Sequence, residues 1–376
     1  MNLSEAFTPA LTLDLGKFRR NCERMVGKCR GLGVPLRPHM KTMKSIEAAR
    51  IAIDPAHRGI AVSTLQEAEY FAGHAIDDIQ LALCITPDKL KRAAALARSI
   101  PRFSFFLDSI EVARAVAEFA RAEGVAFRAW IEIDSGDRRT GLVPGSDLLM
   151  PIAETLKGSP AVLAGVATHG GHSYSGRDQH AISAVAEQER GAVLEAAERL
   201  RASGHEVPGV SAGSTPTAVY ATSGEGLTEL RAGVYMAGDL FQAGIGSQGE
   251  DDVAVSVLAT VISHKPEHNQ IVIDAGGLAL SKDRSTFAIE GGDFGYGLVV
   301  DLEGNPSFGR MIVAGVHQEH GEIQGEMPLP FERLPIGTKV RILPNHSCMT
   351  AAAYDRFLVV DGGTDVSATW HRVNGW

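Results

Sequence analysis

The sequence predicts an α/β fold: a (β/α)₈ TIM barrel followed by a separate C-terminal β domain. Strand-like and helical stretches alternate from residue 34 to about residue 245, and eight strand–helix units are what such a barrel requires. After residue 250 the stretches are of β type only, separated by Gly, Pro and Asn. A doubly wound sheet is the alternative, but no G-x-G-x-x-G motif follows any strand, which favours the barrel.

The chain begins with an alternating stretch at 8–14, which predicts a strand. A helix follows, and Phe18, Cys22 and Cys29 lie on its apolar side, so we interpret both cysteines as core residues. Ser63, with Gln66 three residues later, predicts a capping box at a helix start. The predicted barrel strands are 34–40, 59–63, 78–83, 103–107, 127–134, 163–169, 208–212 and 228–232, and clear helices lie near 109–122, 147–157 and 178–203.

These patterns predict three parts. Residues 1–14 form a strand that joins the β domain, residues 15–245 form the barrel, and residues 250–376 form the β domain, with a linker at 246–252. The predicted strands of the β domain are 253–262, 270–274, 298–302, 311–316, 339–343, 356–361 and 367–370.

Composition limits the classes of function. The formal charge is −9, which argues against nucleic acid as a partner. No run of eighteen apolar residues occurs and the first residues do not resemble a signal peptide, so we expect no membrane segment. Four cysteines in 376 residues suit a reducing cytoplasm, where we expect the protein to act on a small molecule.

The first chemical motif is Arg37-Pro38-His39-Met40-Lys41, at the end of the first barrel strand. A lysine there is a candidate for a covalent imine with an aldehyde, since Arg37, His39 and Lys44 could lower its pKa. A solvated surface lysine is the alternative interpretation.

Other polar residues follow the ends of later strands, where barrel active sites lie. Gly213, Ser214 and Thr215 after strand seven are the clearest phosphate-binding candidates, although an ordinary turn has the same composition. Arg139 after strand five could hold an anionic oxygen, and Arg138 beside it is interpreted as a solvated charge. His169 and Tyr174 follow strand six, and strand eight ends in the stretch from Arg231 to Tyr235, of which Tyr235 is the predicted cofactor contact.

The β domain contains one dense polar cluster, Pro344-Asn345-His346-Ser347-Cys348. In an extended chain His346 and Cys348 would point the same way, and imidazole and thiolate suit Zn²⁺. H-x-C alone is a weak motif. A second cluster, 318–321, could line the same cleft or form an exposed turn.

The order and spacing of these motifs, with Thr8-Pro9-Ala10 and Ser211-Ala212-Gly213-Ser214-Thr215-Pro216, span almost the entire chain. Together they resemble the pyridoxal-phosphate enzymes of the alanine-racemase-like fold, fold type III, in the D-serine dehydratase and D-threonine aldolase group. This includes enzymes that dehydrate D-threo-3-hydroxyaspartate.

The resemblance implies that Lys41 forms the imine with pyridoxal phosphate and that Arg139 lies near the phenolic oxygen of the cofactor. It implies that Gly213, Ser214 and Thr215 bind the phosphate, and that the enzyme is a homodimer. It further implies that His346 and Cys348 hold a divalent metal, with Zn²⁺ favoured and Mn²⁺ or Mg²⁺ as alternatives. Members of the family often have a histidine where this chain has Met43, so a polar role at that position is in doubt.

The metal ligands favour one reaction. Relatives that cleave D-threonine typically pair the histidine with aspartate, whereas the dehydratases pair it with cysteine, as Cys348 does here. The expected function is therefore a lyase that dehydrates D-serine or D-threo-3-hydroxyaspartate to a keto acid and ammonia. D-threonine aldolase is the alternative, followed by an amino-acid racemase; a non-catalytic cofactor carrier and a zinc hydrolase without pyridoxal phosphate are further rivals.

Overall fold

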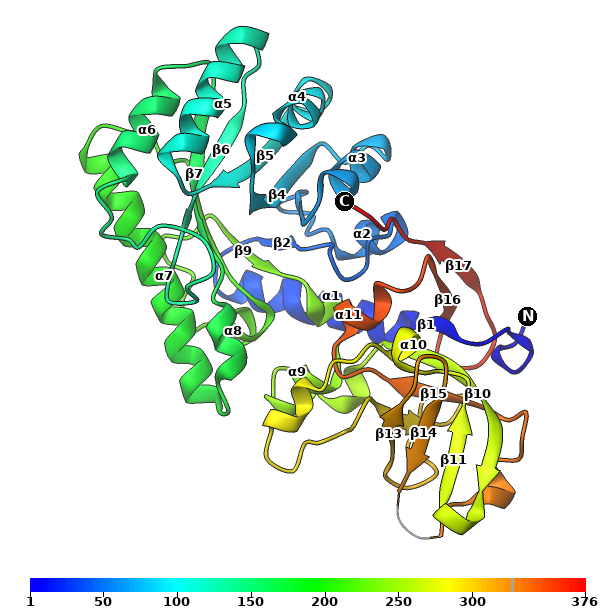
Figure 1. Cartoon of the computed structure of the whole chain (residues 1–376). Helices are drawn as coiled ribbons and strands as arrows, with labels where there is room; N and C mark the ends of the chain where they lie inside the picture. Colours follow the sequence, from blue (N-terminus) through cyan, green and yellow to red (C-terminus); the bar gives the residue numbers. More distant parts are fainter. Residues whose placement is uncertain (326–327) are drawn as a thin grey trace. The chain divides into compact units, whose positions relative to one another are not determined.

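The computed structural model describes residues 1–325 and 328–376, which divide into two compact units. One unit comprises Met1–Cys22 and Val234–Arg372, and the other comprises Glu23–Gly233 and Val373–Trp376. Helix α1 (Leu15–Gly31) contributes to both units. Figure 1 shows the course of the whole chain, coloured from the N-terminus to the C-terminus. The domain boundaries at residues 14, 245 and 250 stay a prediction.

The second unit is the predicted parallel barrel. Its eight strands follow one another in the order β2-β9-β8-β7-β6-β5-β4-β3, every pairing between them is parallel, and a bridge between His39 and Ala61 links β2 back to β3. The eight-stranded barrel is therefore confirmed. The strands are β2 (Leu36–Pro38), β3 (Ile60–Val62), β4 (Asp78–Cys84), β5 (Arg102–Leu107), β6 (Arg128–Ile133), β7 (Val162–Thr168), β8 (Gly209–Ala212) and β9 (Glu229–Ala232).

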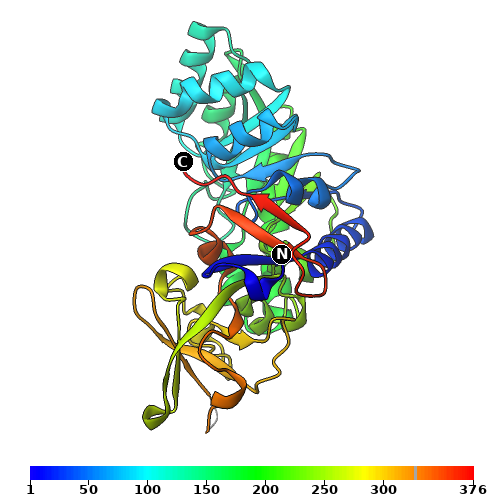
Figure 2. The same cartoon turned by 90° about the vertical axis from the view of Figure 1, so that its right-hand side faces the viewer.

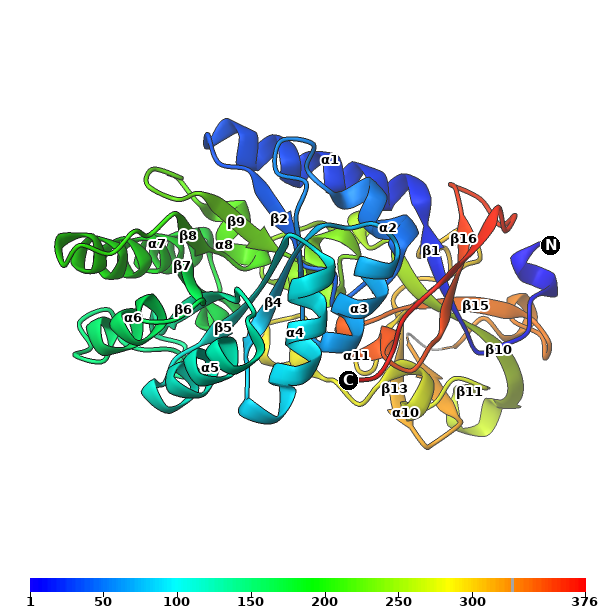
Figure 3. The same cartoon turned by 90° about the horizontal axis from the view of Figure 1, so that it is seen from above.

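Helices lie outside this ring of strands, as the view from above shows (Figure 3). Side chains cap several of the helix starts: Ser109 accepts from the amide of Val112, and Asp178 accepts from that of Ala181. The cap predicted at Ser63 is wrong by one residue, because Thr64 is the N-cap and accepts from Glu67. The helices are α2 (Ile46–Ala52), α3 (Leu65–Gly73), α4 (Leu90–Ser99), α5 (Ile110–Glu123), α6 (Leu149–Lys157), α7 (Gln179–Ala202) and α8 (Thr215–Tyr220).

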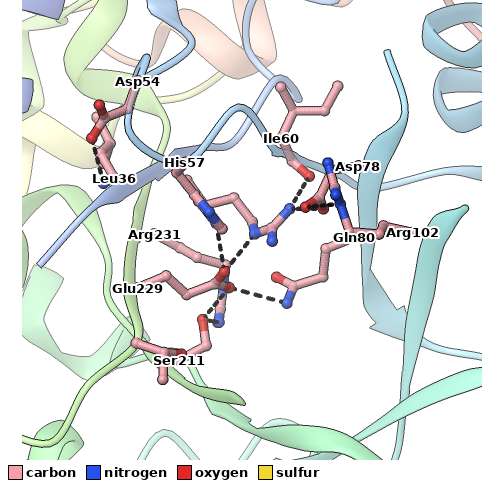
Figure 4. Close-up of polar contacts among 12 residues, drawn as sticks. Leu36, Asp54, His57, Ile60, Asp78, Gln80, Arg102, Ser211, Glu229 and Arg231 are labelled. Carbon is pink, nitrogen blue, oxygen red and sulfur yellow. Dashed lines mark hydrogen bonds and ion pairs between the residues drawn. The ribbon is translucent and has the colours of Figure 1, made fainter. Parts of the chain in front are cut away.

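A buried network of charges fills part of the barrel interior (Figure 4). Glu229 on β9 forms ion pairs with Arg37 at 2.8 Å and with His57 at 2.8 Å, and Arg37 also pairs with Asp78 at 2.7 Å. Glu229 further accepts hydrogen bonds from Gln80 and Ser211. Because β4 and β9 are not neighbours in the sheet, their side chains meet across the inside of the barrel. Arg231 joins the network by donating to the hydroxyl of Ser211.

The first unit is built on a nine-stranded sheet in the order β11-β14-β13-β12-β15-β10-β1-β16-β17, with a further pairing of β10 and β11. Strand β1 pairs antiparallel with β10 and parallel with β16, so a strand from the start of the chain lies beside one from near its end in this sheet (Figure 2). The strands are β1 (Ala10–Asp14), β10 (Val255–Lys265), β11 (Gln270–Ile273), β12 (Leu298–Val300), β13 (Met311–Val316), β14 (Gly321–Gln324), β15 (Lys339–Leu343), β16 (Arg356–Val360) and β17 (Ala368–His371).

Strand β14 was not among the predicted strands, because its four residues carry no hydrophobic alternation beyond Ile323. Residues 318–320, just before it, form an exposed turn. Three short helices complete this unit: α9 (Leu240–Gly244), α10 (Gly277–Leu280) and α11 (Ser347–Ala351). Within the part of the chain that the structure describes, we find no helix with the length and apolarity needed to cross a membrane.

Candidate active site

Lys41 lies in the turn that follows β2, at the carboxyl end of the barrel strands. The pairing of β2 with β9 and the bridge from His39 to Ala61 fix the start of this turn. The amide of Lys41 donates to Nδ1 of His39 at 3.3 Å, and the side chains of Thr42 and Met43 are buried. The lysine is therefore anchored at its backbone, while its side chain remains half-buried.

The cations near Lys41 differ from those expected. Arg37 is engaged by Asp78 and Glu229, and Lys44 pairs with Glu67 at 3.3 Å. The charges of Lys41, Arg139 and Arg231 all act on the imidazoles of His39 and His169, so Arg139 and Arg231 are the arginines of this region. Arg231 comes from the strand-eight stretch from which Tyr235 was predicted. Arg231 is two residues after Glu229, so both side chains lie on the same face of the strand. This spacing indicates that the Arg231 side chain points into the barrel.

Two half-buried histidines line the same region and are neutral. Burial and the charges of Lys41 and Arg231 hold the pKa of His39 well below its usual range. Burial, followed by Lys41 and Arg139, lowers the pKa of His169 to about 3. Both imidazoles therefore lack a charge at neutral pH, and the positive potential comes from Lys41, Arg139 and Arg231.

Arg139 lies in the loop after β6. Its guanidinium is 3.7 Å from Glu132 and 3.9 Å from Asp137, and about half of the side chain is exposed, at 53%. Arg138 is exposed, with a positive φ of 57°. Arg139 is thus loosely held by two carboxylates and can turn toward an anionic group.

The predicted phosphate contacts follow β8, and the loop after β7, with His169 and Tyr174, is hydrogen-bonded to them. His169 contacts the carbonyl of Gly213 at 3.0 Å, and the hydroxyls of Ser173 and Ser214 are 3.0 Å apart. Gly213 has a φ of +131°, and a Cβ there would lie 2.4 Å from the carbonyl oxygen of Arg231. Ser214 caps α8 by accepting from the amide of Thr217 at 3.2 Å.

The remaining predicted residues in these loops are Tyr174 and Thr215. Tyr174 is half-buried in the 3₁₀ turn Gly171–Ser175, and Thr215 is buried at the first position of α8. The barrel unit thus holds Lys41 and the predicted residues of the loops after β6, β7 and β8. Tyr235 belongs to the other unit, where its side chain is buried and its carbonyl accepts from Gln248.

The predicted metal ligands lie where β15 ends. Asn345 is buried and donates to the carbonyls of Asp283 and Gly295, which fixes the backbone just before His346. The assumption of an extended chain is wrong here, since His346 is the N-cap of α11 and Cys348 lies in its first turn. The helical turn nevertheless keeps the imidazole and the thiol in hydrogen-bonding contact.

Asp283 completes this group, and sequence reasoning missed it. Its carboxylate is 3.1 Å from Nδ1 of His346 and also accepts from the amide of Ser285 at 2.8 Å. Burial disfavours the imidazolium, but hydrogen bonds with Asp283 and Cys348 outweigh it and raise the pKa of His346 to about 11. A carboxylate on one imidazole nitrogen is the usual support of a metal-binding histidine.

These donors fit a divalent metal. Nδ1 of His346 is occupied by Asp283, which leaves Nε2 for a metal shared with the Cys348 sulfur. Among residues 1–325 and 328–376, no group of three or more His, Cys, Asp and Glu side chains is arranged to hold a metal ion. The His346–Cys348 pair would therefore be completed by water or substrate.

Comparison with protein families gives two matches that together cover most of the chain. Residues 13–240 match the model described as alanine racemase, N-terminal domain. Residues 254–360 match the model described as putative serine dehydratase domain.

Individual relatives match the chain from end to end. D-threo-3-hydroxyaspartate dehydratase from Delftia sp. (strain HT23) is 43% identical over 98% of both chains. D-serine dehydratase from Dictyostelium discoideum is 31% identical over 98% of this chain and 97% of that protein. D-threonine aldolase from Arthrobacter sp. is 28% identical over 96% and 91%.

Solved structures agree. The structure of D-threo-3-hydroxyaspartate dehydratase from Delftia sp. HT23 superimposes with a TM-score of 0.93 at 41% identity, covering 100% of both chains. A cysteine-to-alanine mutant of D-threo-3-hydroxyaspartate dehydratase, described as in the metal-free form, has a TM-score of 0.95 at 40% identity and also covers 100% of both chains.

Proposed function

Because this chain belongs to the alanine-racemase-like family and to its serine dehydratase group, we propose that it dehydrates D-3-hydroxy amino acids with pyridoxal phosphate and a divalent metal. The substrate is D-threo-3-hydroxyaspartate or D-serine, and the products are a keto acid and ammonia. The observation that carries the proposal is Lys41 at the barrel mouth, among the two cations Arg139 and Arg231 and two neutral histidines.

These residues suit a phosphorylated aldehyde. Lys41, Arg139 and Arg231 bring positive charge to the imidazole rings of His39 and His169, so an anionic cofactor would be stabilised there. Lys41 would hold the aldehyde carbon, while Ser214 and Thr215 would bind the phosphate beside the fixed turn at Gly213. When bound, pyridoxal phosphate supplies an electron sink for the negative charge that develops at the substrate α-carbon.

Lys41 then has a second role. Once the substrate amine has replaced it, its free amine would remove the proton from the substrate α-carbon as a general base. His39 supports the backbone of Lys41 through the 3.3 Å hydrogen bond. The neutral state of His39 and His169 means that neither imidazole competes as a proton donor at this step.

His346 and Cys348 would hold the metal, for which we favour Zn²⁺, with Mn²⁺ or Mg²⁺ as alternatives. The metal supplies Lewis-acid assistance to departure of the 3-hydroxyl group. Cys348 supports dehydration over aldol cleavage, because the resemblance pairs histidine with cysteine in the dehydratases. Asp283 would keep His346 in the tautomer that presents Nε2.

Product analysis tests this function. The protein should be yellow, with a near-visible absorption band that Lys41→Ala removes. Incubation with D-serine or D-threo-3-hydroxyaspartate should yield pyruvate or oxaloacetate with ammonia. Glycine and an aldehyde would instead indicate an aldolase, and the L-enantiomer of the added amino acid would indicate a racemase. A colourless preparation would contradict the presence of pyridoxal phosphate.

We retain two further proposals: the enzyme is a homodimer, as the resemblance implies, and it is cytoplasmic, as its four cysteines suggest. The domain boundaries predicted at residues 14, 245 and 250 also remain proposals. Sedimentation of the cofactor-loaded protein at several concentrations tests the first of these, because a homodimer of this chain would have a mass of about twice 40.0 kDa.

A further inference from the structure

Glu189 is a buried carboxyl group for which the proposed reaction has no use. It lies on α7, a helix whose other glutamates are exposed, and only 2% of its surface is accessible. Its place in the apolar stripe with Ile182, Val193 and Ala196 turns it toward the barrel. A charged group in such a position requires hydrogen-bond partners or a proton.

The partners of Glu189 come from the segments after β7 and β8, which carry predicted cofactor contacts. The amide of Gly170, in the loop after β7, donates to its carboxylate. The amide of Gly213, directly after β8, and the hydroxyl of Thr217, in the first turn of α8, also hydrogen-bond it. A Cβ at residue 170 would lie 2.6 Å from Cδ of Glu189, so the carboxyl group fills the space that the glycine leaves.

We propose that Glu189 is a positioning residue that fixes the two cofactor loops to each other and takes up a proton when an anionic phosphate binds to them. This inference rests on the proposed function, since it assumes that the phosphate of the cofactor binds at Ser214 and Thr215. Glu189 itself does not contact the cofactor; it acts through the amides of Gly170 and Gly213.

The charges around Glu189 make proton uptake favourable. Arg231 on β9 is the charged group that faces it and stabilises its anion, while the contacts from the loops are amides and a hydroxyl, and His169 nearby is neutral. Burial outweighs these effects and raises the pKa of Glu189 to about 7. A phosphate bound on the adjoining loop would repel the carboxylate and raise that pKa further.

The sign of the effect follows from linkage. If the bound state holds a proton that the free state has lost, binding weakens as pH rises through and above the pKa of free Glu189. A suitable probe is pyridoxine 5′-phosphate, which has the ring and phosphate of the cofactor but no aldehyde. It forms no imine with Lys41, so imine formation does not contribute to the pH dependence of its Kd. The ionisation of the probe itself is common to all variants and cancels in a ratio of dissociation constants.

The experiment compares wild type, Glu189→Gln and the control Glu195→Gln, an exposed glutamate on the same helix. The ratio of the wild-type Kd to the Glu189→Gln Kd should rise between about pH 6 and about pH 9, by at most about tenfold per pH unit for one linked proton. Amide exchange in segments 169–175 and 213–217 should be faster in Glu189→Gln and unchanged in Glu195→Gln. A ratio independent of pH, or unchanged exchange, would overturn the proposal.

Two further measurements keep the outcomes separate. If Glu189→Gln does not fold, Glu189→Asp replaces it, because aspartate keeps a titrating carboxyl group but is too short to reach Gly170. Amide exchange at Gly170 should then be faster, while binding of the probe stays pH-dependent. Unchanged protection of the Gly170 amide would overturn the proposal. The near-visible band of wild type with pyridoxal phosphate tests the proposed function by itself. If that band forms but the Kd ratio is flat, only the role of Glu189 fails; if wild type binds neither compound, both proposals fail.

Discussion

Asp283 determines what His346 can do as a ligand. Its carboxylate lies 3.1 Å from Nδ1 of His346 and accepts a hydrogen bond from the amide of Ser285. The hydrogen bond with His346 is the main cause that lowers the pKa of Asp283 to about 2. Asp283 therefore stays ionised throughout the range in which the enzyme would work. A metal must displace the proton that His346 shares with Cys348, so metal binding should release protons.

We predict that Asp283→Asn weakens metal binding by about 10- to 100-fold, because the imidazole loses the carboxylate that orients it. Titration of the metal-stripped protein with Zn²⁺, followed by calorimetry or a competing chelator, measures this loss. Asp293→Asn is the matched control, since Asp293 is an exposed aspartate that pairs with Arg284. Equal affinity of Asp283→Asn and wild type would rule out the supporting role.

The candidate site residues that were predicted and those that were not differ in how local their sequence signals are. Lys41 and the stretch from Gly213 to Thr215 directly follow predicted strands, so their positions along the chain were sufficient to propose them. Asp283 meets His346 across 63 residues, and no pattern in the sequence connects them. Glu189 had a signal, a glutamate within an apolar helical stripe, but glutamate is also common on the exposed sides of that helix.

At the level of elements, the barrel strands were predictable because they are buried on both sides and separated by amphipathic helices. Each of the eight predicted ranges overlaps its observed strand, as 103–107 overlaps β5 and 163–169 overlaps β7. Short elements were not predictable. Helix α11 has five residues, fewer than two turns, so its sequence carries no period that distinguishes it from an extended segment.

The charge network inside the barrel supports β2, β4, β8 and β9 together, and Glu229 is its centre. Burial opposes ionisation, but the ion pair with Arg37 and the hydrogen bond with His57 outweigh it, so the pKa of Glu229 lies below its usual value. A depressed carboxyl pKa contributes stability that is present at neutral pH and is lost as pH falls below about 4.

We predict that Glu229→Gln lowers the free energy of unfolding by about 3–5 kcal/mol at neutral pH, because it removes one of the two carboxylates that pair with the buried Arg37 and leaves only Asp78. Urea unfolding followed by circular dichroism measures the change, and the exposed Glu118→Gln on α5 is the control. The difference from wild type should shrink on acidification. A constant difference down to about pH 3 would show that the ionised carboxylate is not the source of the stability.

For the whole molecule, the residues proposed for proton removal and those proposed to hold the metal belong to different compact units. Lys41 is in the barrel unit, and His346 and Cys348 are in the unit built on the nine-stranded sheet. This division follows the two family matches, 13–240 and 254–360. It also implies that loss of the metal should stop one step of the reaction and leave the other.

We therefore predict that Cys348→Ala, or removal of the metal with a chelator, abolishes formation of keto acid while the cofactor band remains. Exchange of the substrate α-proton with deuterium should persist, since Lys41 performs that step without the metal. Met349→Ala is the matched control, because Met349 is the exposed neighbour on the same helix, with 54% of its surface accessible. Mass spectrometry in heavy water follows exchange and product together. Full dehydratase activity in Cys348→Ala would refute the metal assignment, and loss of exchange along with dehydration would show that the metal also acts at the α-carbon.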